Sequence, residues 1–279
     1  MCELVSVYIT THNRKKLLMR AIKSVESQDY KNIELIVVDD ASSDGTEEMM
    51  LEYVNNNKNV KYFRTEESRG ACFNRNIAIE NAKGYYISGL DDDDYFEPER
   101  VSQLVSHFDE NKYSCVTSAI VAFDNLGFKK AFHRRGKIIT LNALLHFNHV
   151  GNQVLTTKKR LIEVGGFDVD FLACQDYDLW VRLVSKFGPC KRLAYQSYNM
   201  YVGDSHFRIS TSANKEIGHK QFLEKHKYLM SSSAVRAFNY VTKMQLGKEI
   251  SFFDFFSVIS FPIFHIQVYQ LLRKFLDIK

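Results

Sequence analysis

Residues 34–46 read Glu-Leu-Ile-Val-Val-Asp-Asp-Ala-Ser-Ser-Asp-Gly-Thr. The short, apolar, β-branched run predicts a buried strand over residues 33–38, and the Asp44-Gly45 pair indicates a turn after it. Thr46, which two glutamates follow, is typical of a helix N-cap with an acidic first turn. A buried strand that leads through a polar turn into a helix is the βα unit of a parallel sheet.

The same alternation extends on both sides of this unit. Strands are predicted at residues 4–9, 60–63 and 85–88, and helices at residues 16–28 and 71–81. Farther on, the pattern predicts helices at 99–108, 143–149, 158–164 and 175–187, strands at 113–123 and 152–157, and helical segments from about residue 214. We therefore predict an α/β fold with a mostly parallel, Rossmann-like central sheet flanked by helices, and a C-terminal helical segment.

Composition limits the possible classes of function. The chain has 279 residues, is 45% apolar and carries a net charge of +4, which is too mild to indicate a nucleic-acid-binding protein. Five widely spaced cysteines predict neither a disulfide framework nor a zinc site. The first residues resemble a strand and lack the features of a signal peptide, so we expect a cytoplasmic protein.

Three polar clusters follow predicted strands, at residues 10–13, 39–44 and 91–94. Ligands bind at the carboxyl ends of parallel strands, so we expect these clusters to converge on one site. The third cluster is four consecutive aspartates. Such a run is costly because like charges repel, and a divalent cation offsets that cost. A solvated acidic turn is the alternative.

Two other kinds of site do not fit the sequence. An EF-hand loop that began at Asp91 would need Gly at its sixth position and Glu at its twelfth, where Phe96 and Ser102 stand. A dinucleotide site needs a Gly-x-Gly-x-x-Gly loop, whereas the first turn is Thr-Thr-His-Asn.

Six segments, in order over roughly residues 4–210, together resemble family 2 glycosyltransferases of the GT-A fold. They are residues 5–13, residues 34–46, Gly70-Ala-Cys-Phe-Asn-Arg-Asn76, Leu90-Asp-Asp-Asp-Asp-Tyr-Phe-Glu-Pro98, Gly165-Gly-Phe-Asp168 and Gln175-Asp-Tyr-Asp-Leu-Trp180. The resemblance implies an inverting enzyme that uses a nucleotide-diphospho-sugar, UDP-linked by expectation, with Mn²⁺ or Mg²⁺. It also implies a GT-A domain over residues 1–213, with donor binding in 1–100 and acceptor binding and catalysis in 101–213, and a helical, aromatic-rich extension over 214–279.

The resemblance assigns donor-binding roles to residues near the ends of the first predicted strands. By resemblance, Thr10 and His12 contact the nucleotide, and Asp40 or its neighbour Asp39 reads the pyrimidine ring; for Asp39, the alternative is a residue that holds the following turn. Arg75 would face the diphosphate, and the alternatives here are a surface salt bridge or the use of Arg69 in its place.

Within the acidic run, the resemblance places Asp91 and Asp92 near the ribose and Asp93 on the metal, with Asp94 supporting the turn. The family often has a small residue where this chain has Asp92, so it is left open which of these aspartates contacts the ribose and which holds the metal. His206 matches a second metal ligand that some relatives supply from a late loop, and a plain loop histidine is the alternative.

Asp176 is the candidate catalytic base, which the resemblance favours over a residue that only caps the helix. Asp178 is the nearest rival, but two residues along a helix it points elsewhere.

The extension is strongly apolar over residues 251–272, but polar residues interrupt it and basic residues flank it. We expect it to pack on the protein or to lie on the inner face of the plasma membrane, rather than to span the bilayer.

The expected reaction extends a glycan or lipid-linked glycan in cell-surface polysaccharide synthesis, as in capsule or lipopolysaccharide. Two other classes stay open: a nucleotidyltransferase, which would carry a Gly-rich phosphate loop after the first strand, and a catalytically silent nucleotide-sugar-binding module.

Overall fold

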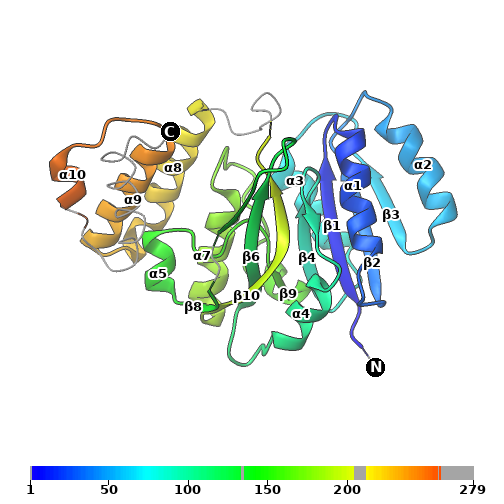
Figure 1. Ribbon diagram of the computed structural model, residues 1–279, viewed down its shortest axis with the longest axis horizontal. Helices are drawn as coiled ribbons and strands as arrows, with labels where there is room; N and C mark the ends of the chain where they lie inside the picture. Colours follow the sequence, from blue (N-terminus) through cyan, green and yellow to red (C-terminus); the bar gives the residue numbers. More distant parts are fainter. Residues whose placement is uncertain (1, 133–134, 204–211, 257, 259–279) are drawn as a thin grey trace.

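The computed structural model describes residues 2–132, 135–203, 212–256 and 258. Its centre is a ten-stranded sheet whose main path has the order β3-β2-β1-β4-β9-β6-β10-β5. Helices cover both faces of this sheet, and a group of helices lies beyond its left side in Figure 1. The predicted α/β class is confirmed.

The first half of the sheet is parallel. Strands β1 (Val5–Thr11), β2 (Ile33–Asp39), β3 (Val60–Arg64) and β4 (Tyr86–Asp91) alternate with helices α1 (Lys15–Glu26), α2 (Thr46–Asn56) and α3 (Ala71–Asn81). These elements match the predicted ones to within a few residues at their ends. Every residue of β2 is buried, because helices lie on both faces of the sheet, and this explains its unbroken apolar run.

The second half of the sheet is mixed. Strand β9 (Leu155–Thr157) lies antiparallel between β4 and β6 (Cys115–Phe123), and β10 (Cys190–Tyr201) runs parallel to β6. Two short strands, β5 (Tyr95–Phe96) and β8 (Lys137–Ile139), pair antiparallel with β10, and β7 (Lys129–Phe132) pairs antiparallel with β6. None of β5, β7, β8 and β10 was predicted from the sequence.

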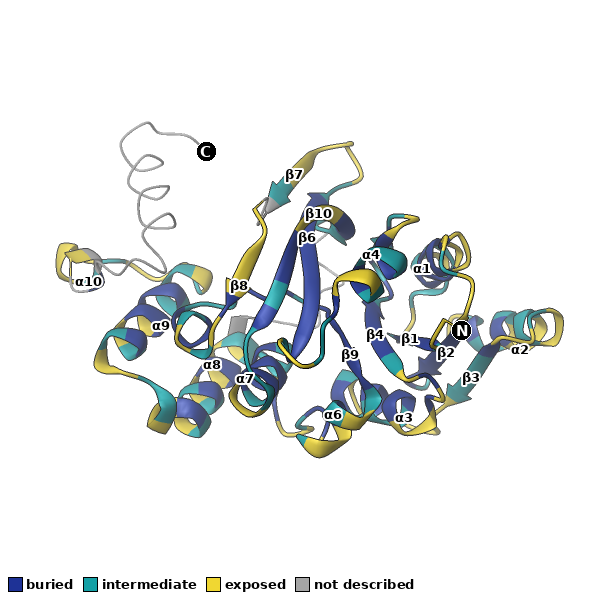
Figure 2. Ribbon diagram, turned by 90° about the horizontal axis from the view of Figure 1, so that it is seen from below, coloured by how far each residue is buried: buried dark blue, intermediate teal, exposed yellow. Residues whose placement is uncertain are grey.

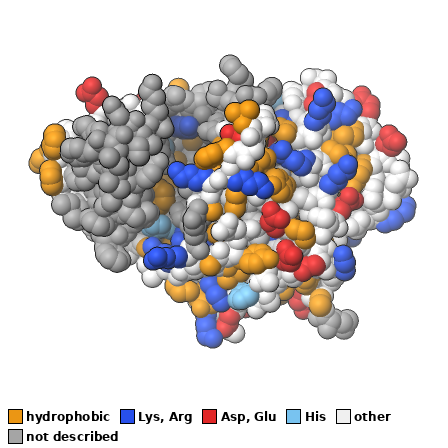
Figure 3. Space-filling view, viewed as in Figure 1, with side chains coloured by type: hydrophobic (Ala, Val, Ile, Leu, Met, Phe, Trp, Pro, Cys, Tyr) orange, Lys and Arg blue, Asp and Glu red, His pale blue; other side chains and the backbone are white. Residues whose placement is uncertain are grey.

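The helices form two layers. Figure 2 shows α1 and α4 (Arg100–His107) on one face of the sheet, and α3, α6 (Lys158–Glu163) and α7 (Gln175–Phe187) on the other. A separate apolar core fills the space on each face. On the face drawn in Figure 3, Lys and Arg side chains of the described residues alternate with Asp and Glu and form no basic stripe.

The remaining helices are α5 (Leu141–His146), α8 (Ser212–His226), α9 (Ser232–Gln245) and α10 (Phe252–Phe256), with a 3-10 turn at Lys227–Leu229. The α7 ring of Tyr177 stacks on Phe222 of α8, with ring centroids 4.1 Å apart, and Phe222 stacks on Phe238 of α9 at 4.9 Å. Helices α8 and α9 therefore share a core with α7. Among the described residues, no helix is both long enough and apolar enough to cross a bilayer.

Candidate active site

The three polar clusters meet at one edge of the sheet, as predicted. Thr10 pairs with Val38 on one side and with Asp91 on the other, so the ends of β2, β1 and β4 lie next to one another. Asn13 joins the first two loops: its backbone N–H donates to Ser42 Oγ at 2.8 Å, and its Oδ1 accepts from the backbone N–H of Ser43 at 2.7 Å.

Three non-glycine residues among those described have a positive φ; two lie in these loops and the third precedes α7. They are Asn13 (φ 54°), Ala41 (φ 57°) and Cys174 (φ 65°). Left-handed backbone is unfavourable for residues with a Cβ, so surrounding contacts must hold it in place. Cys174 directly precedes α7 and sets the direction in which its first turn, with Asp176, leaves the loop.

The second loop carries two aspartates with structural partners. Asp39 is fully buried; its Oδ1 accepts from the backbone N–H of Ser42 at 2.9 Å and its Oδ2 accepts from Tyr62 Oη at 2.7 Å. Contact between Asp39 and a base is therefore not supported, and the structure shows the alternative, a residue that holds the turn. Asp44 likewise accepts from Thr46 and from the backbone N–H of Lys15.

Asp40 organises the loop before α3. It accepts from the backbone N–H groups of Arg69 and Gly70, at 2.7 and 3.0 Å, and from the side chains of Ser68 and Asn74, at 2.7 and 2.6 Å. Burial alone would raise the pKa of Asp40, but these donors outweigh it and hold the pKa below its ordinary value.

His12 connects the first loop to the second. The ring Nδ1 of this exposed residue lies 2.6 Å from the carbonyl oxygen of Asp40. His12 and the half-buried Thr10 therefore border the same loops as Asp40, where the nucleotide is expected.

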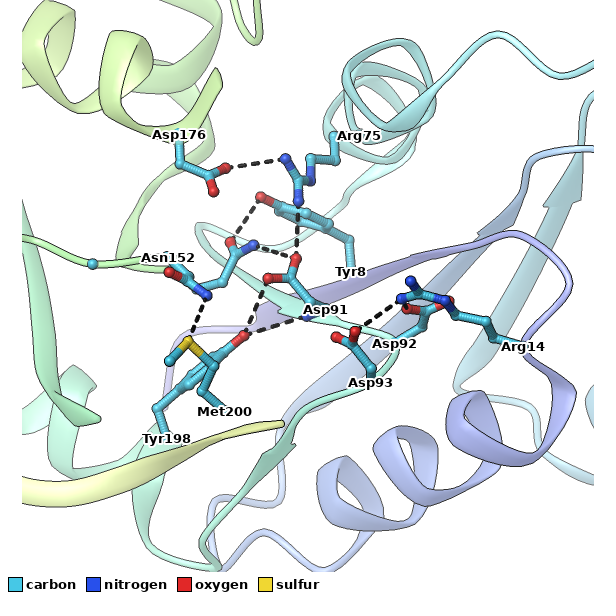
Figure 4. Close-up of polar contacts among 12 residues, drawn as sticks. Tyr8, Arg14, Arg75, Asp91, Asp92, Asp93, Asn152, Asp176, Tyr198 and Met200 are labelled. Atoms are coloured by element: carbon cyan, nitrogen blue, oxygen red, sulfur yellow. Dashed lines mark hydrogen bonds and ion pairs between the residues drawn. The ribbon is translucent and has the colours of Figure 1, made fainter. Parts of the chain in front are cut away.

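The acidic run begins at the end of β4. Gly89, two residues before it, lies so close to its neighbours that a Cβ would be 2.1 Å from Gln153 Oε1 and 2.6 Å from the Tyr8 ring. This close packing brings Gln153 Nε2 to 2.9 Å from Asp91 Oδ1, and Tyr198 Oη lies 3.5 Å from Asp91 Oδ2. Figure 4 shows Asp91 at the centre of this network.

Arg14 connects the next two carboxylates. Its Nη1 donates to Asp92 at 2.8 Å and to Asp93 at 2.9 Å, and Thr11 Oγ1 also donates to Asp92 at 2.8 Å. Asp92 is buried, so a ribose contact would have to break one of these bonds; Asp91 is the accessible carboxylate of the two expected near the ribose.

Asp93 is partly exposed and has a raised pKa. Burial and the neighbouring charges of Asp91 and Asp92 raise it to about 6, and Arg14 opposes the rise. Asp94 is buried and accepts from the backbone N–H of Tyr201 at 2.8 Å, so it ties the acidic turn to β10, in line with the structural role expected for it.

Arg75 joins the acidic run to the candidate base. Its Nη2 donates to Asp91 Oδ1 at 2.9 Å and its Nη1 donates to Asp176 Oδ1 at 3.0 Å. The guanidinium is buried and lies over the Phe167 ring. The alternative of a surface salt bridge for Arg75 is therefore wrong. The ion pairs of Arg75 are internal, and they connect the acidic run to the first turn of α7. Arg69, the competing choice, is exposed and stacks on Phe73.

Asp176 lies at the start of α7 with an unusual pKa. Burial raises the pKa of Asp176 to about 7; the Arg75 cation opposes the rise and the Asp91 charge adds to it. A carboxylate with a pKa near neutrality suits a general base. Asp176 also borders a cavity of about 620 Å³ between the sheet and the helices α5, α8 and α9.

Asp178, the rival candidate, points away from this cavity. It is fully buried and accepts from Arg182 at 2.6 Å, Lys225 at 2.9 Å and His226 at 2.8 Å. These donors outweigh its burial and hold the pKa of Asp178 well below the ordinary value. Its role is structural, as its position on the helix predicted.

Asn76 holds the first of the two motifs expected near the acceptor, residues 165–168. Its Oδ1 accepts from the backbone N–H of Phe167 and its Nδ2 donates to the carbonyl of Phe167, both at 2.8 Å. Gly166 has φ +65°, and a Cβ there would be 2.6 Å from Asn76 Oδ1. The Arg75-Asn76 pair therefore reaches both the base and the loop before α7.

Four residues of this site were not found from the sequence: Tyr8, Arg14, Gln153 and Tyr198. Arg14 directly follows the first polar loop, which was a usable signal. Tyr8 and Tyr198 lie on β1 and β10, Gln153 precedes β9, and the three become neighbours only when distant segments pair. His206 falls in residues 204–211, outside the described residues. No group of three or more His, Cys, Asp or Glu suited to a metal ion occurs among the described residues.

The sheet therefore has a carboxylate cluster at its parallel strand ends and a carboxylate of raised pKa, Asp176, joined to it through Arg75, which is the arrangement expected for a nucleotide-sugar transferase. The family model for glycosyl transferase family 2 matches residues 6–179, and the chain belongs to that family. It is a glycosyltransferase.

Relatives and solved structures agree with this assignment. The chain is 34% identical over 234 residues to WcaA of Escherichia coli (strain K12), named for colanic acid biosynthesis, covering 80% of this chain and 81% of WcaA. It is 30% identical to the GalNAc(5)-diNAcBac-PP-undecaprenol beta-1,3-glucosyltransferase of Campylobacter jejuni, covering 72% of this chain and 66% of that protein. The crystal structure of S. aureus TarS 1–349 with UDP-GlcNAc shares the fold, with a TM-score of 0.65, 18% identity, and coverage of 99% and 76%.

Proposed function

We propose that this glycosyltransferase transfers a sugar, with inversion, from a UDP-sugar to a hydroxyl of a glycan or lipid-linked glycan in cell-surface polysaccharide synthesis. The observation that carries the proposal is the position of Asp176. This carboxylate, with a pKa raised to about 7, faces a cavity on one side and is joined through Arg75 to the acidic run on the other.

The reaction follows from this arrangement. Asp176 takes the proton from the acceptor hydroxyl while that oxygen attacks the anomeric carbon from the face opposite the diphosphate. The new C–O bond forms as the bond to the diphosphate oxygen breaks, so the electron pair leaves with the nucleotide. Burial makes Asp176 a stronger base than an exposed aspartate, and Arg75 keeps a useful fraction of it ionised near neutral pH.

The donor is assigned to the strand-end loops. Thr10, His12 and Asp40 border the expected nucleotide position, and Asp91 is the partly exposed carboxylate on the ribose side. A carboxylate that accepts from a ring N–H would favour uracil. Asp40 is buried and already accepts from four donors, so a uracil N–H would have to replace one of them to be read by Asp40. TarS, whose fold is the same, was crystallised with UDP-GlcNAc.

A divalent cation, Mn²⁺ or Mg²⁺, fits the acidic run. Such ions take one or two carboxylates together with phosphate oxygens, so a set of three protein ligands is not required. Burial and the neighbouring charges of Asp91 and Asp92 raise the pKa of Asp93, and a cation would relieve this repulsion. Asp93 is the partly exposed member suited to hold the cation. When bound, the ion would neutralise charge on the leaving diphosphate.

The acceptor class is proposed from the relatives. WcaA is named for colanic acid biosynthesis and the Campylobacter jejuni protein for an undecaprenol-linked glycan. A lipid-linked acceptor would bring the chain to a membrane surface. Phe252, Phe253 and Phe256 of α10 are exposed, and hydrophobic side chains lie at the left edge of Figure 3, where Figure 1 places α10. Contact through residues 251–272 stays a prediction, since residues 257 and 259–279 lie outside the described part.

Donor binding and metal dependence test the proposal. We expect UDP with Mn²⁺ to raise the melting temperature, because a ligand that binds only the native state stabilises it. EDTA or Asp93→Asn should remove most of this effect and most of the transfer activity. The matched control is Asp109→Asn, an exposed aspartate distant from the site. Absence of UDP binding, or activity that persists in Asp93→Asn with EDTA, would overturn the proposal.

A further inference from the structure

The residues that line the cavity beside Asp176 are of two kinds. Some are apolar, such as Ile120, Phe147, Met200 and Phe238, and others carry amide or imidazole groups, on α5, α7, α8 and α9 and in the loops between elements. In Figure 4, Asn152 lies below Asp176, with Met200 beyond it, and both line the cavity. A lining that combines apolar side chains with amide groups suits a sugar ring, which has an apolar face and a rim of hydroxyls.

The charge of this cavity is the informative feature. Of the described residues that line it, Asp176 is the only Asp, Glu, Lys or Arg. The nearest guanidinium, on Arg75, already bridges Asp176 and Asp91. A carboxylate or phosphate on the reacting sugar would therefore give up its hydration without forming an ion pair with a described lining residue. It would also be repelled by the negative charge of Asp176. An ammonium group would instead pair with Asp176 and occupy the base.

The outer wall offers a fixed hydrogen-bonding group. His219 Nδ1 lies 2.5 Å from the carbonyl oxygen of Lys215, and His219 Nε2 lies 2.8 Å from Gln245 Oε1. With this oxygen toward the imidazole ring, the NH₂ group of Gln245 is the part of the amide that can donate to a hydroxyl in the cavity.

We propose that this cavity binds the sugar of the acceptor that receives the new bond, that this sugar is uncharged, and that Gln245 of α9 helps to select it. The inference rests on the proposed transferase function. It makes α8 and α9 part of the acceptor site and places any phosphate of a lipid-linked acceptor outside the cavity.

Saturation-transfer NMR on the full chain with UDP and Mn²⁺ tests this inference. The probes are methyl β-D-glucopyranoside, methyl N-acetyl-β-D-glucosaminide and methyl β-D-glucuronide. We expect signals from at least one neutral glycoside and none from the glucuronide. Gln245→Trp, which fills the cavity from an exposed position, should abolish the neutral signal, and Gln245→Leu should weaken it. Lys220→Ala, on the exposed side of α8, should leave it unchanged.

The outcomes separate the two proposals. Loss of UDP binding in the wild-type protein contradicts the proposed function itself. UDP binding without a signal from any neutral glycoside contradicts only the cavity assignment, as does an equal signal from the glucuronide. A neutral signal that survives in Gln245→Trp also contradicts it. UDP-induced thermal shifts of both Gln245 variants verify that they are folded.

Discussion

The two sides of the first turn of α7 carry the same functional group in opposite environments. Asp178 faces α8, where Arg182, Lys225 and His226 surround it and its pKa falls. Asp176 faces the sheet and the cavity, where Arg75 is its partner and burial raises its pKa to about 7. Asp178 is fully buried and the side chain of Asp176 is 23% exposed, and the number of cationic donors also differs between them. That number separates a structural anion from one that can accept a proton.

The same contrast appears within the acidic run. Asp92 and Asp94 are buried and bonded to Thr11, Arg14 and the backbone of β10, whereas Asp91 and Asp93 keep part of their surface exposed. A site built in this way uses some carboxylates as supports and leaves others for ligands.

Asp176→Asn should produce the largest effect on the reactive side of α7. Asparagine keeps the shape and can still accept from Arg75, but it cannot take a proton. We expect the rate of sugar transfer to fall roughly 10²- to 10⁴-fold, the usual contribution of a general base. The measurement is transfer at saturating donor, with UDP binding as the control, which should stay close to that of the wild type. Transfer within a few-fold of the wild type would show that another group is the base.

Asp178→Asn should instead affect stability. It leaves the cation of Arg182 without its buried counter-charge, whereas Lys225 keeps its ion pair with Asp168, and breaking a buried pair costs about 3–5 kcal/mol. We expect a loss of stability at the lower end of this range, since Lys225 is partly exposed. Urea unfolding at pH 7 measures this loss, and transfer by the folded fraction should persist. An unchanged unfolding midpoint would mean that the ion cluster does not connect α8 to α7.

The loss in Asp178→Asn should also depend on pH. The folded pKa of Asp178 is lowered, so its contribution is fully present above the ordinary aspartate value of about 3.9 and is lost as pH falls below it. The difference in stability between wild type and variant should therefore stay constant from pH 7 to about 4 and narrow only as the pH falls further.

Asn76→Ala should have the smallest effect. It removes two hydrogen bonds to Phe167, whose ring supports Arg75 on one side and contacts Trp180 of α7 on the other. Unpaired buried backbone groups cost about 1–3 kcal/mol, so unfolding should shift by that amount. Asn56→Ala, at the exposed end of α2, serves as the control. No shift relative to that control would contradict the bridging role of Asn76.

Local signals in the sequence explain which parts of the fold could be predicted. Strands β1, β2 and β4 are short apolar runs bounded by turns and buried on both faces, and β3 is short and partly buried, so pattern alone located them. Strand β10 carries Lys191, Arg192, Gln196 and Asn199, and its register shifts between Leu193 and Tyr198. Such a bulge breaks the period-two alternation, so the strand had no local signature.

The site was predictable to a similar extent. Motifs indicated the acidic run and Asp176, because each follows a recognisable element. The bridge through Arg75 joins residues 101 positions apart in sequence, and Gln153 reaches Asp91 over 62 positions. Neither contact has a local pattern, and the raised pKa of Asp176 depends on burial by elements that the sequence does not place.

The central claim is that Asp176 acts as the base with a pKa near 7 that Arg75 restrains. The most direct measurement is the pH dependence of transfer at saturating donor, Mn²⁺ and acceptor, for the wild type and for Arg75→Gln. The wild-type rate should fall about tenfold for each pH unit below about 7, because the base must be ionised. Loss of the Arg75 cation should raise the pH below which the rate falls by about 1–3 pH units. A wild-type rate that is constant down to about pH 5 would contradict the claim, and so would an Arg75→Gln rate that falls below the same pH as the wild type.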